Sequence, residues 1–122
     1  MPAYESGDFD PPAPVVRAKV FGPDQTVYRG VPLLLDTGAD ISVIPLDVAT
    51  AVGAVIHHSS VPVEFLGGER MTCAQGDLVV EFLKYRFQGR FLLAESAYGV
   101  LGRNVLNLLL LTIDGPNLLW SA

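Results

Sequence analysis

The sequence predicts a small all-β protein, a closed β-barrel or sandwich of short strands with one or two short helices. Three observations carry this prediction. The chain has 122 residues, the length of one ordinary domain. Half of these residues are hydrophobic, which is enough for a core. Its 12 glycines and 9 prolines separate short apolar runs at close spacing, which is typical of all-β domains.

Residues 1–14 are polar and rich in proline, so they are expected to form an N-terminal arm in front of a folded domain at 15–122. Apolar runs indicate strands, and Gly and Pro mark turns and helix ends. The domain is expected to begin with a strand at 15–21, a strand buried on both faces at 26–35, a short apolar segment at 41–44 and a helix at 46–52. Two hairpins are expected next, one at 61–75 with its tip at Gly67 and Gly68 and a second that turns at Gln88 and Gly89. A short helix at 102–108 and a closing hairpin at 109–120 are expected to complete the domain.

Charge and composition exclude several classes of function. The balance of 8 basic and 13 acidic residues gives a net charge of −5, which disfavours binding to nucleic acid. The single cysteine, Cys73, forms no internal disulfide and is expected to be a small buried hydrophobe. His57 and His58 are expected on a loop, without the further ligands that a metal site needs. The sequence shows neither a secretory signal nor an apolar run of about 18 residues, so we expect a cytoplasmic protein without a membrane partner.

The most informative stretch is LLLDTGADISVIP, residues 33–45, because it places Asp36 between apolar runs. A buried carboxylate is costly unless hydrogen bonds compensate for the lost water. A tight turn through Thr37 and Gly38 directs backbone N–H groups at that carboxylate, and glycine permits such a turn. Ala39 is small and leaves space beside the acid. The apolar flanks favour a rigidly held loop over a surface turn whose Asp merely caps it.

This stretch resembles the active-site segment of the retroviral-type aspartic proteases, the retropepsins. A second stretch, YGVLGRNVL at 98–106, is similar to the family's pattern of apolar residues, Gly, Arg and Asn or Asp before a short helix. The glycine-tipped hairpin lies between the two, where the family has its flap. The resemblance spans roughly residues 15–120. The expected closing hairpin is more similar to the cellular and bacterial single-domain members than to the viral enzymes.

The resemblance implies an aspartic endopeptidase that hydrolyses peptide bonds without a metal or organic cofactor. In that chemistry one carboxyl takes a proton from water while a second donates one to the substrate carbonyl. Two acids about 3 Å apart share one proton. The chain has a single Asp-Thr-Gly, so the second Asp36 must come from a homodimer. Thr37 is then expected to interlock with its copy across the two-fold axis, and Gly38 allows the two loops to approach.

The family's other site residues carry over to positions near these two stretches. Asp40, beside Ala39, is expected to hold the substrate backbone and to pair with Arg103, since a guanidinium fits a carboxylate through two hydrogen bonds. Gly102 and Asn104 give structural support, Asn104 by bonding nearby backbone. The residues Phe65, Leu66, Gly67 and Gly68 are expected to form a flap that closes over the peptide, although an ordinary hairpin turn is the alternative.

Two further alternatives stay open. The first concerns four apolar residues, which either line side-chain pockets for the substrate or belong to the core: Val43, Ile44, Leu66 and Val100. The whole chain is an enzyme or a catalytically silent module of the same fold that binds peptides or dimerises.

Overall fold

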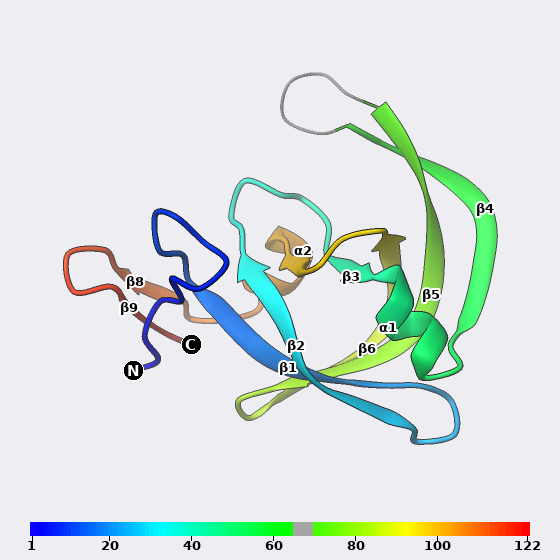
Figure 1. The fold of residues 1–122 in the computed structure, drawn as a ribbon, viewed down its shortest axis with the longest axis horizontal. Coiled ribbons are helices and arrows are strands. Elements are labelled where there is room, and N and C mark those ends of the chain that lie inside the picture. The colour runs from blue at the N-terminus through cyan, green and yellow to red at the C-terminus, as the bar shows by residue number, and fades with distance from the viewer. Residues whose placement is uncertain (65–69) are drawn as a thin grey trace.

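The structure of the protein, a computed structural model, describes residues 1–64 and 70–122, and their side chains except those of 59–61 and 70–72. Within these described residues it contains nine strands and two short helices (Figure 1). In chain order they are β1 (Val15–Phe21), β2 (Val27–Leu35), β3 (Val43–Pro45), α1 (Leu46–Ala51), β4 (Val55–Glu64), β5 (Arg70–Phe82), β6 (Tyr85–Ala94), β7 (Gly99–Leu101), α2 (Arg103–Leu106), β8 (Thr112–Asp114) and β9 (Leu119–Ser121).

Six of the strands close a barrel in the order β1-β2-β7-β3-β6-β5, because β5 pairs back with β1. The parallel pairings of β2 with β7 and of β3 with β6 bring distant parts of the chain together. Side chains that alternate along the strands fill the interior, as the period of two requires. The most deeply buried are Val20, Val31, Leu33, Ile44 and Leu101. The all-β barrel with short helices is therefore confirmed.

Strand β2 is not buried along its whole length, so the prediction for 26–35 is wrong in this respect. Only Val31, Leu33 and Leu35 are buried, and the first half of the strand is exposed from Tyr28 to Gly30. The barrel covers one face of the second half. The continuous apolar run concealed this alternation because Pro32 and Leu34 are apolar residues on the half-buried face.

The second hairpin turns at Leu83 and Lys84, not at Gln88 and Gly89. Phe82 lies opposite Tyr85 in the register of β5 and β6, and Gly89 sits within the ladder opposite Leu78. Leu83 adopts a left-handed conformation with φ of 50°, which is uncommon for a residue with a Cβ. The rings of Phe82 and Phe87 stack at 5.6 Å between centroids. This packing favours the observed register over a turn at the glycine.

Strands β4 and β5 form a long hairpin, and the end of β4 and the start of β5 extend beyond the rest of the barrel (Figure 1). Its last described pair is Glu64 opposite Arg70. The expected flap residues Phe65, Leu66, Gly67 and Gly68 lie outside the described residues.

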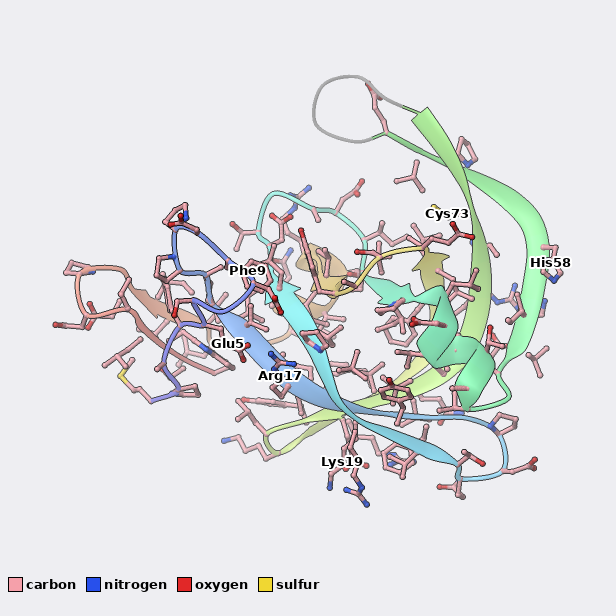
Figure 2. The ribbon with its side chains drawn as sticks, viewed as in Figure 1. Glu5, Phe9, Arg17, Lys19, His58 and Cys73 are labelled. Atoms are coloured by element: carbon pink, nitrogen blue, oxygen red, sulfur yellow. The ribbon has the colours of Figure 1, made fainter. Side chains whose placement is uncertain are left out.

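Two histidines that the sequence placed on a loop lie on strand β4 instead. The Nε2 atom of His57 is 2.8 Å from an Asp77 oxygen on β5, and Arg90 on β6 donates to the other oxygen at 3.2 Å. The hydrogen bonds from His57 and then from Arg90 hold the pKa of the Asp77 carboxyl below its usual range. His58 points away from the barrel, whereas Cys73 is buried on β5 (Figure 2). Burial raises the pKa of the Cys73 thiol, as expected of a small buried hydrophobe.

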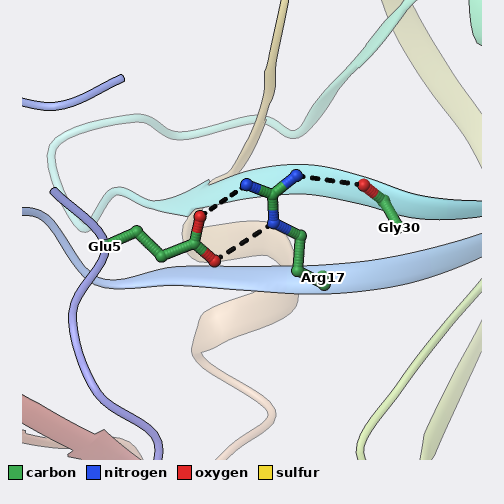
Figure 3. Close-up of polar contacts among 3 residues, drawn as sticks. All are labelled: Glu5, Arg17 and Gly30. Carbon is green, nitrogen blue, oxygen red and sulfur yellow. Dashed lines mark hydrogen bonds and ion pairs between the residues drawn. The ribbon is translucent and has the colours of Figure 1, made fainter. Parts of the chain in front are cut away.

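The N-terminal residues fold back onto the body of the protein. Ala3 forms a β-bridge with Leu119, and the backbone N–H of Trp120 donates to the carbonyl of Pro2 at 2.9 Å. Both carboxylate oxygens of Glu5 accept from Arg17 on β1, and Arg17 also donates to the Gly30 carbonyl (Figure 3). The division into an arm at 1–14 and a domain at 15–122 stays a prediction.

The C-terminal hairpin of β8 and β9 forms a small separate sheet. Trp120 on β9 is 1% exposed and packs into the main core, so it anchors this hairpin to the barrel. None of the helices in the described parts of the chain is long and apolar enough to span a membrane.

Candidate active site

Asp36 lies directly after β2, where the strand leaves the barrel. Its N–H donates to the carbonyl of Leu101 on β7 at 3.0 Å, so the parallel strand pair fixes its backbone. Its carboxylate accepts a hydrogen bond of 2.9 Å from the N–H of Gly38, and the Ala39 N–H donates to its carbonyl at 3.2 Å. Asp36 is half-buried, and its carboxylate is held by its own turn, as the sequence around it predicts.

Helix α2 holds this loop from the other side. The N–H of Arg103 donates to the Ala39 carbonyl at 2.8 Å, and the N–H of Asn104 donates to the Asp40 carbonyl at 3.3 Å. We predicted an ion pair between Arg103 and the Asp40 carboxylate. This prediction is wrong, because the described residues contain no such pair. The guanidinium instead donates to the Thr37 carbonyl at 2.7 Å. Arg103 thus supports the loop by donating hydrogen bonds to backbone carbonyls of the loop, and the Asp40 side chain stays exposed.

Ser42 is a structural residue that the sequence reasoning missed. It is fully buried, its hydroxyl donates to the Asn104 side-chain oxygen at 2.8 Å, and it accepts from the Gly102 N–H at 3.0 Å. The side chain of Asn104 therefore bonds a hydroxyl, not backbone as predicted. The signal in the sequence was a lone serine inside the apolar run ISVI, since a buried polar group needs partners.

Ser42→Ala is expected to lower the free energy of unfolding by about 1–3 kcal/mol, because the buried N–H of Gly102 and the part-buried amide oxygen of Asn104 lose their shared partner. Chemical denaturation checks this value. The exposed Ser6→Ala is the matched control and is expected to change stability by less than about 0.5 kcal/mol. Equal stabilities of the two variants would show that this network does not hold the loop.

Gly102 is required for the close approach of α2 to the Asp36 loop. A Cβ at this position would lie 2.5 Å from the carbonyl oxygen of Ile41 and 2.8 Å from its nitrogen. Both atoms belong to backbone, so no side-chain rotation relieves the clash.

Gly102→Ala is expected to destabilise the fold by about 2–3 kcal/mol, as overpacking in a tight core does. Thermal unfolding measures this loss. Gly89→Ala is the matched control, because a Cβ there meets nothing within 4 Å. A Gly102→Ala protein as stable as the control would contradict the close approach.

Asp36 opens into a pocket of about 370 Å³. Four predicted site residues meet there, together with apolar residues and the end of β4. The lining consists of Asp36, Gly38, Ala39, Asp40, Ile41, Val43, Val63, Glu64 and Val100. Val43 and Val100 are half-buried and line the pocket, whereas Ile44 is fully buried in the core. Leu66 lies outside the described residues, so its alternative stays open.

Another cavity, of about 590 Å³, lies between α1 and the segment after β6. It is lined by Leu46, Asp47, Thr50, Ala51, Glu95 and Ser96. Elsewhere in the described parts of the chain, no three His, Cys, Asp or Glu residues are grouped as metal ligands would be.

Comparison with known proteins identifies the fold. No protein-family model and no curated protein matches the sequence. Among solved structures, the chain is similar to the EIAV protease complexed with the inhibitor HBY-793, at 21% sequence identity and a TM-score of 0.62. The likeness covers 78% of this chain and 86% of that chain. Because it spans most of both chains and agrees with the closed barrel, the protein has the fold of the retropepsins, the retroviral-type aspartic proteases.

Proposed function

We propose that this protein is a homodimeric aspartic endopeptidase in which each chain supplies Asp36 to a shared pair of carboxyls. The observation that carries this proposal is the placement of Asp36, half-buried in a hydrogen-bonded turn and open to a pocket, on the fold of an aspartic protease. In the proposed reaction one carboxyl takes a proton from water and its twin donates one to the substrate carbonyl. Neither step needs a metal or an organic cofactor.

A second copy of the chain supplies the missing acid. The sequence has a single Asp-Thr-Gly, and the other carboxylates that line the pocket, those of Asp40 and Glu64, lie outside this turn. A two-fold axis beside the loop brings the same turn to itself. Thr37 and Gly38 are exposed in the single chain and are therefore available to a partner.

An apolar surface next to the loop supports the dimer. Leu108 and Leu110 are 71% and 87% exposed, and Ile113 and Leu118 on the closing hairpin are also exposed. This stretch follows α2 directly, and α2 is hydrogen-bonded to the Asp36 loop. We assign these exposed apolar residues to contact with a second copy of the chain, which would cover them.

The substrate of the proposed enzyme is an extended peptide. It would lie in the pocket above Asp36, with Ala39 and Asp40 on the floor and the side chains of Val43 and Val100 as apolar wall. The residues Phe65, Leu66, Gly67 and Gly68 would close over it as a flap at the tip of the β4–β5 hairpin.

Digestion of a peptide library tests the proposal. The wild-type protein is expected to cut peptides in a reaction that pepstatin inhibits, and the Asp36→Asn variant is expected to leave the library intact. A catalytically silent module would bind peptides without producing fragments. Cleavage that persists in Asp36→Asn would contradict the proposed chemistry.

A further inference from the structure

A separate cavity of about 450 Å³ lies where β5 and β6 meet the start of β4 and the turn between β1 and β2. We call it the β5 cavity. It shares no lining residue with the pocket at Asp36. All of the residues that line it are described, so its shape and its polar groups are on the page.

The cavity arises because the edge of β5 changes its partner strand there. Phe21, the last residue of β1, lies opposite Val79, whereas Val55, the first residue of β4, lies opposite Asp77. Leu78 lies between these two pairs and has no residue of β1 or β4 opposite it in the described sheet. The two strands therefore diverge at Leu78. Figure 1 shows the β1–β2 turn and the start of β4 at the same lower corner of the barrel.

The floor of the β5 cavity is the outer face of the sheet. Side chains alternate along a strand, and Leu78 is buried, so its neighbours Asp77 and Val79 face outward. Residues directly opposite each other share a face, which places Arg90 beside Asp77 and Gln88 beside Val79. The floor and rim thus have an apolar part and a polar part, the first made by Phe21, Pro23, Val55 and Val79 and the second by Asp77, Gln88 and Arg90.

The polar part contains a guanidinium of fixed orientation. The Nε atom of Arg90 donates to one Asp77 oxygen at 3.2 Å, and the Nε2 atom of His57 lies 2.8 Å from the other. Both oxygens of Asp77 are therefore occupied. A guanidinium has several further N–H groups, and among the described residues only its Nε is hydrogen-bonded. The edge formed by its two Nη atoms is thus available to an acceptor, and the Gln88 amide lies on the same face of β6.

A carboxylate attached to an apolar body matches this arrangement. The carboxylate accepts two parallel hydrogen bonds from a guanidinium edge, and the apolar body removes the surface of Val55 and Val79 from water. A bare inorganic anion would leave the apolar part uncovered. A cation would meet Arg90 and find the Asp77 oxygens occupied, and no group of three metal-ligating side chains occurs among the described residues.

We propose that the β5 cavity binds a ligand in which a carboxylate is attached to an apolar body, with the carboxylate on Arg90 and the apolar body against Val55 and Val79. This inference goes beyond the proposed peptidase and does not depend on it. A small free acid and the C-terminal end of a peptide both carry this chemistry.

Titration of the protein with 3-phenylpropionate, followed by NMR of the backbone amides, tests the proposal. We expect a dissociation constant of about 1 mM, with shifts at residues 77–79 and 88–90 and none at 36–40. The neutral 3-phenylpropanamide and acetate, which lacks the apolar body, are each expected to bind about tenfold more weakly. Equal binding of the acid and its amide would overturn the inference. So would shifts centred on residues 36–40, or no shift at about 10 mM ligand.

Two substitutions assign the binding to the β5 cavity. Arg90→Gln is expected to weaken the binding of 3-phenylpropionate about tenfold. The matched control Arg29→Gln should bind like the wild type, because Arg29 is exposed on β2 and does not line the cavity. Val55→Asp should also abolish binding by placing a like charge in the apolar part. Val55 is 53% exposed, so thermal unfolding should be unchanged. Wild-type affinity in both Arg90→Gln and Val55→Asp would refute the site.

A peptide with a C-terminal leucine, compared with the same peptide ending in an amide, separates the two sources of the carboxylate. If the free-acid peptide shifts residues 77–79 and 88–90 at lower concentration than 3-phenylpropionate does, the cavity takes a chain end. The opposite order supports a small acid as the ligand. If neither acid shifts these residues, the inference fails.

Discussion

Asp36→Asn is expected to lower the rate of peptide cleavage by about a thousandfold or more, because the substitution removes both carboxyls of the dimer and with them the general acid and base. The turn that holds residue 36 is expected to persist. The hydrogen bond from the Gly38 N–H needs only an oxygen acceptor, which the asparagine amide retains. The loss should therefore appear in kcat with unchanged thermal unfolding, and steady-state kinetics on one cleaved peptide measure it.

Asp24→Asn is the matched control for this prediction. Asp24 is exposed in the turn between β1 and β2, and it does not line the pocket at Asp36. The control is expected to retain wild-type kinetics. A wild-type rate in Asp36→Asn, or an equal loss in both variants, would exclude Asp36 as the catalytic acid.

Leu110→Lys is expected to weaken the dimer by about 30-fold or more. Leucine burial in an interface contributes about 2 kcal/mol, and each 1.4 kcal/mol changes the dissociation constant about tenfold. Because the dimer is symmetric, each interface contains the substituted residue twice. Sedimentation at varied protein concentration measures the shift, and cleavage activity should fall in parallel because an isolated chain holds one Asp36.

The stability of the isolated chain should not change, since Leu110 is 87% exposed. Leu83→Lys is the matched control, because Leu83 is 55% exposed at the turn between β5 and β6. The control is expected to dimerise and to cut peptides like the wild type. If Leu110→Lys also dimerised normally, the surface after α2 would not be the interface.

The parts of the fold that the sequence predicts best are those in which local chemistry and packing agree. Strand β1 alternates clearly, and Pro45 marks the start of α1 as its N-cap. The Asp36 turn was predictable because an acid within an apolar run demands nearby donors, and the Gly38 N–H supplies one.

The errors arose where tertiary packing overrides local preference. The glycine at 89 suggested a turn, but the stacked rings of Phe82 and Phe87 fix the register, and Leu83 accepts an unfavourable φ instead. The sequence alone does not reveal that these two rings are in contact. The alternation in the second half of β2 was missed because apolar residues such as Leu34 also occupy its half-buried face.

The candidate site shows the same contrast. Four of the predicted site residues, Asp36, Gly38, Ala39 and Asp40, line one pocket, and the roles assigned to them stay predictions. Their individual contacts were not predictable, because they depend on how α2 docks. Arg103 reaches the Thr37 carbonyl rather than Asp40, and Ser42 joins Gly102 to Asn104 through its hydroxyl.

Mixing wild-type protein with increasing amounts of Asp36→Asn tests most directly whether two chains share one active site. After the subunits exchange, an equal amount of the variant is expected to reduce the activity of a fixed amount of wild type to about one half, because wild-type chains are captured in dimers with a single Asp36. Leu110→Lys combined with Asp36→Asn should inhibit less at each ratio, since that chain pairs more weakly with the wild type. Activity that stays constant at every ratio would show that each chain cuts peptides alone.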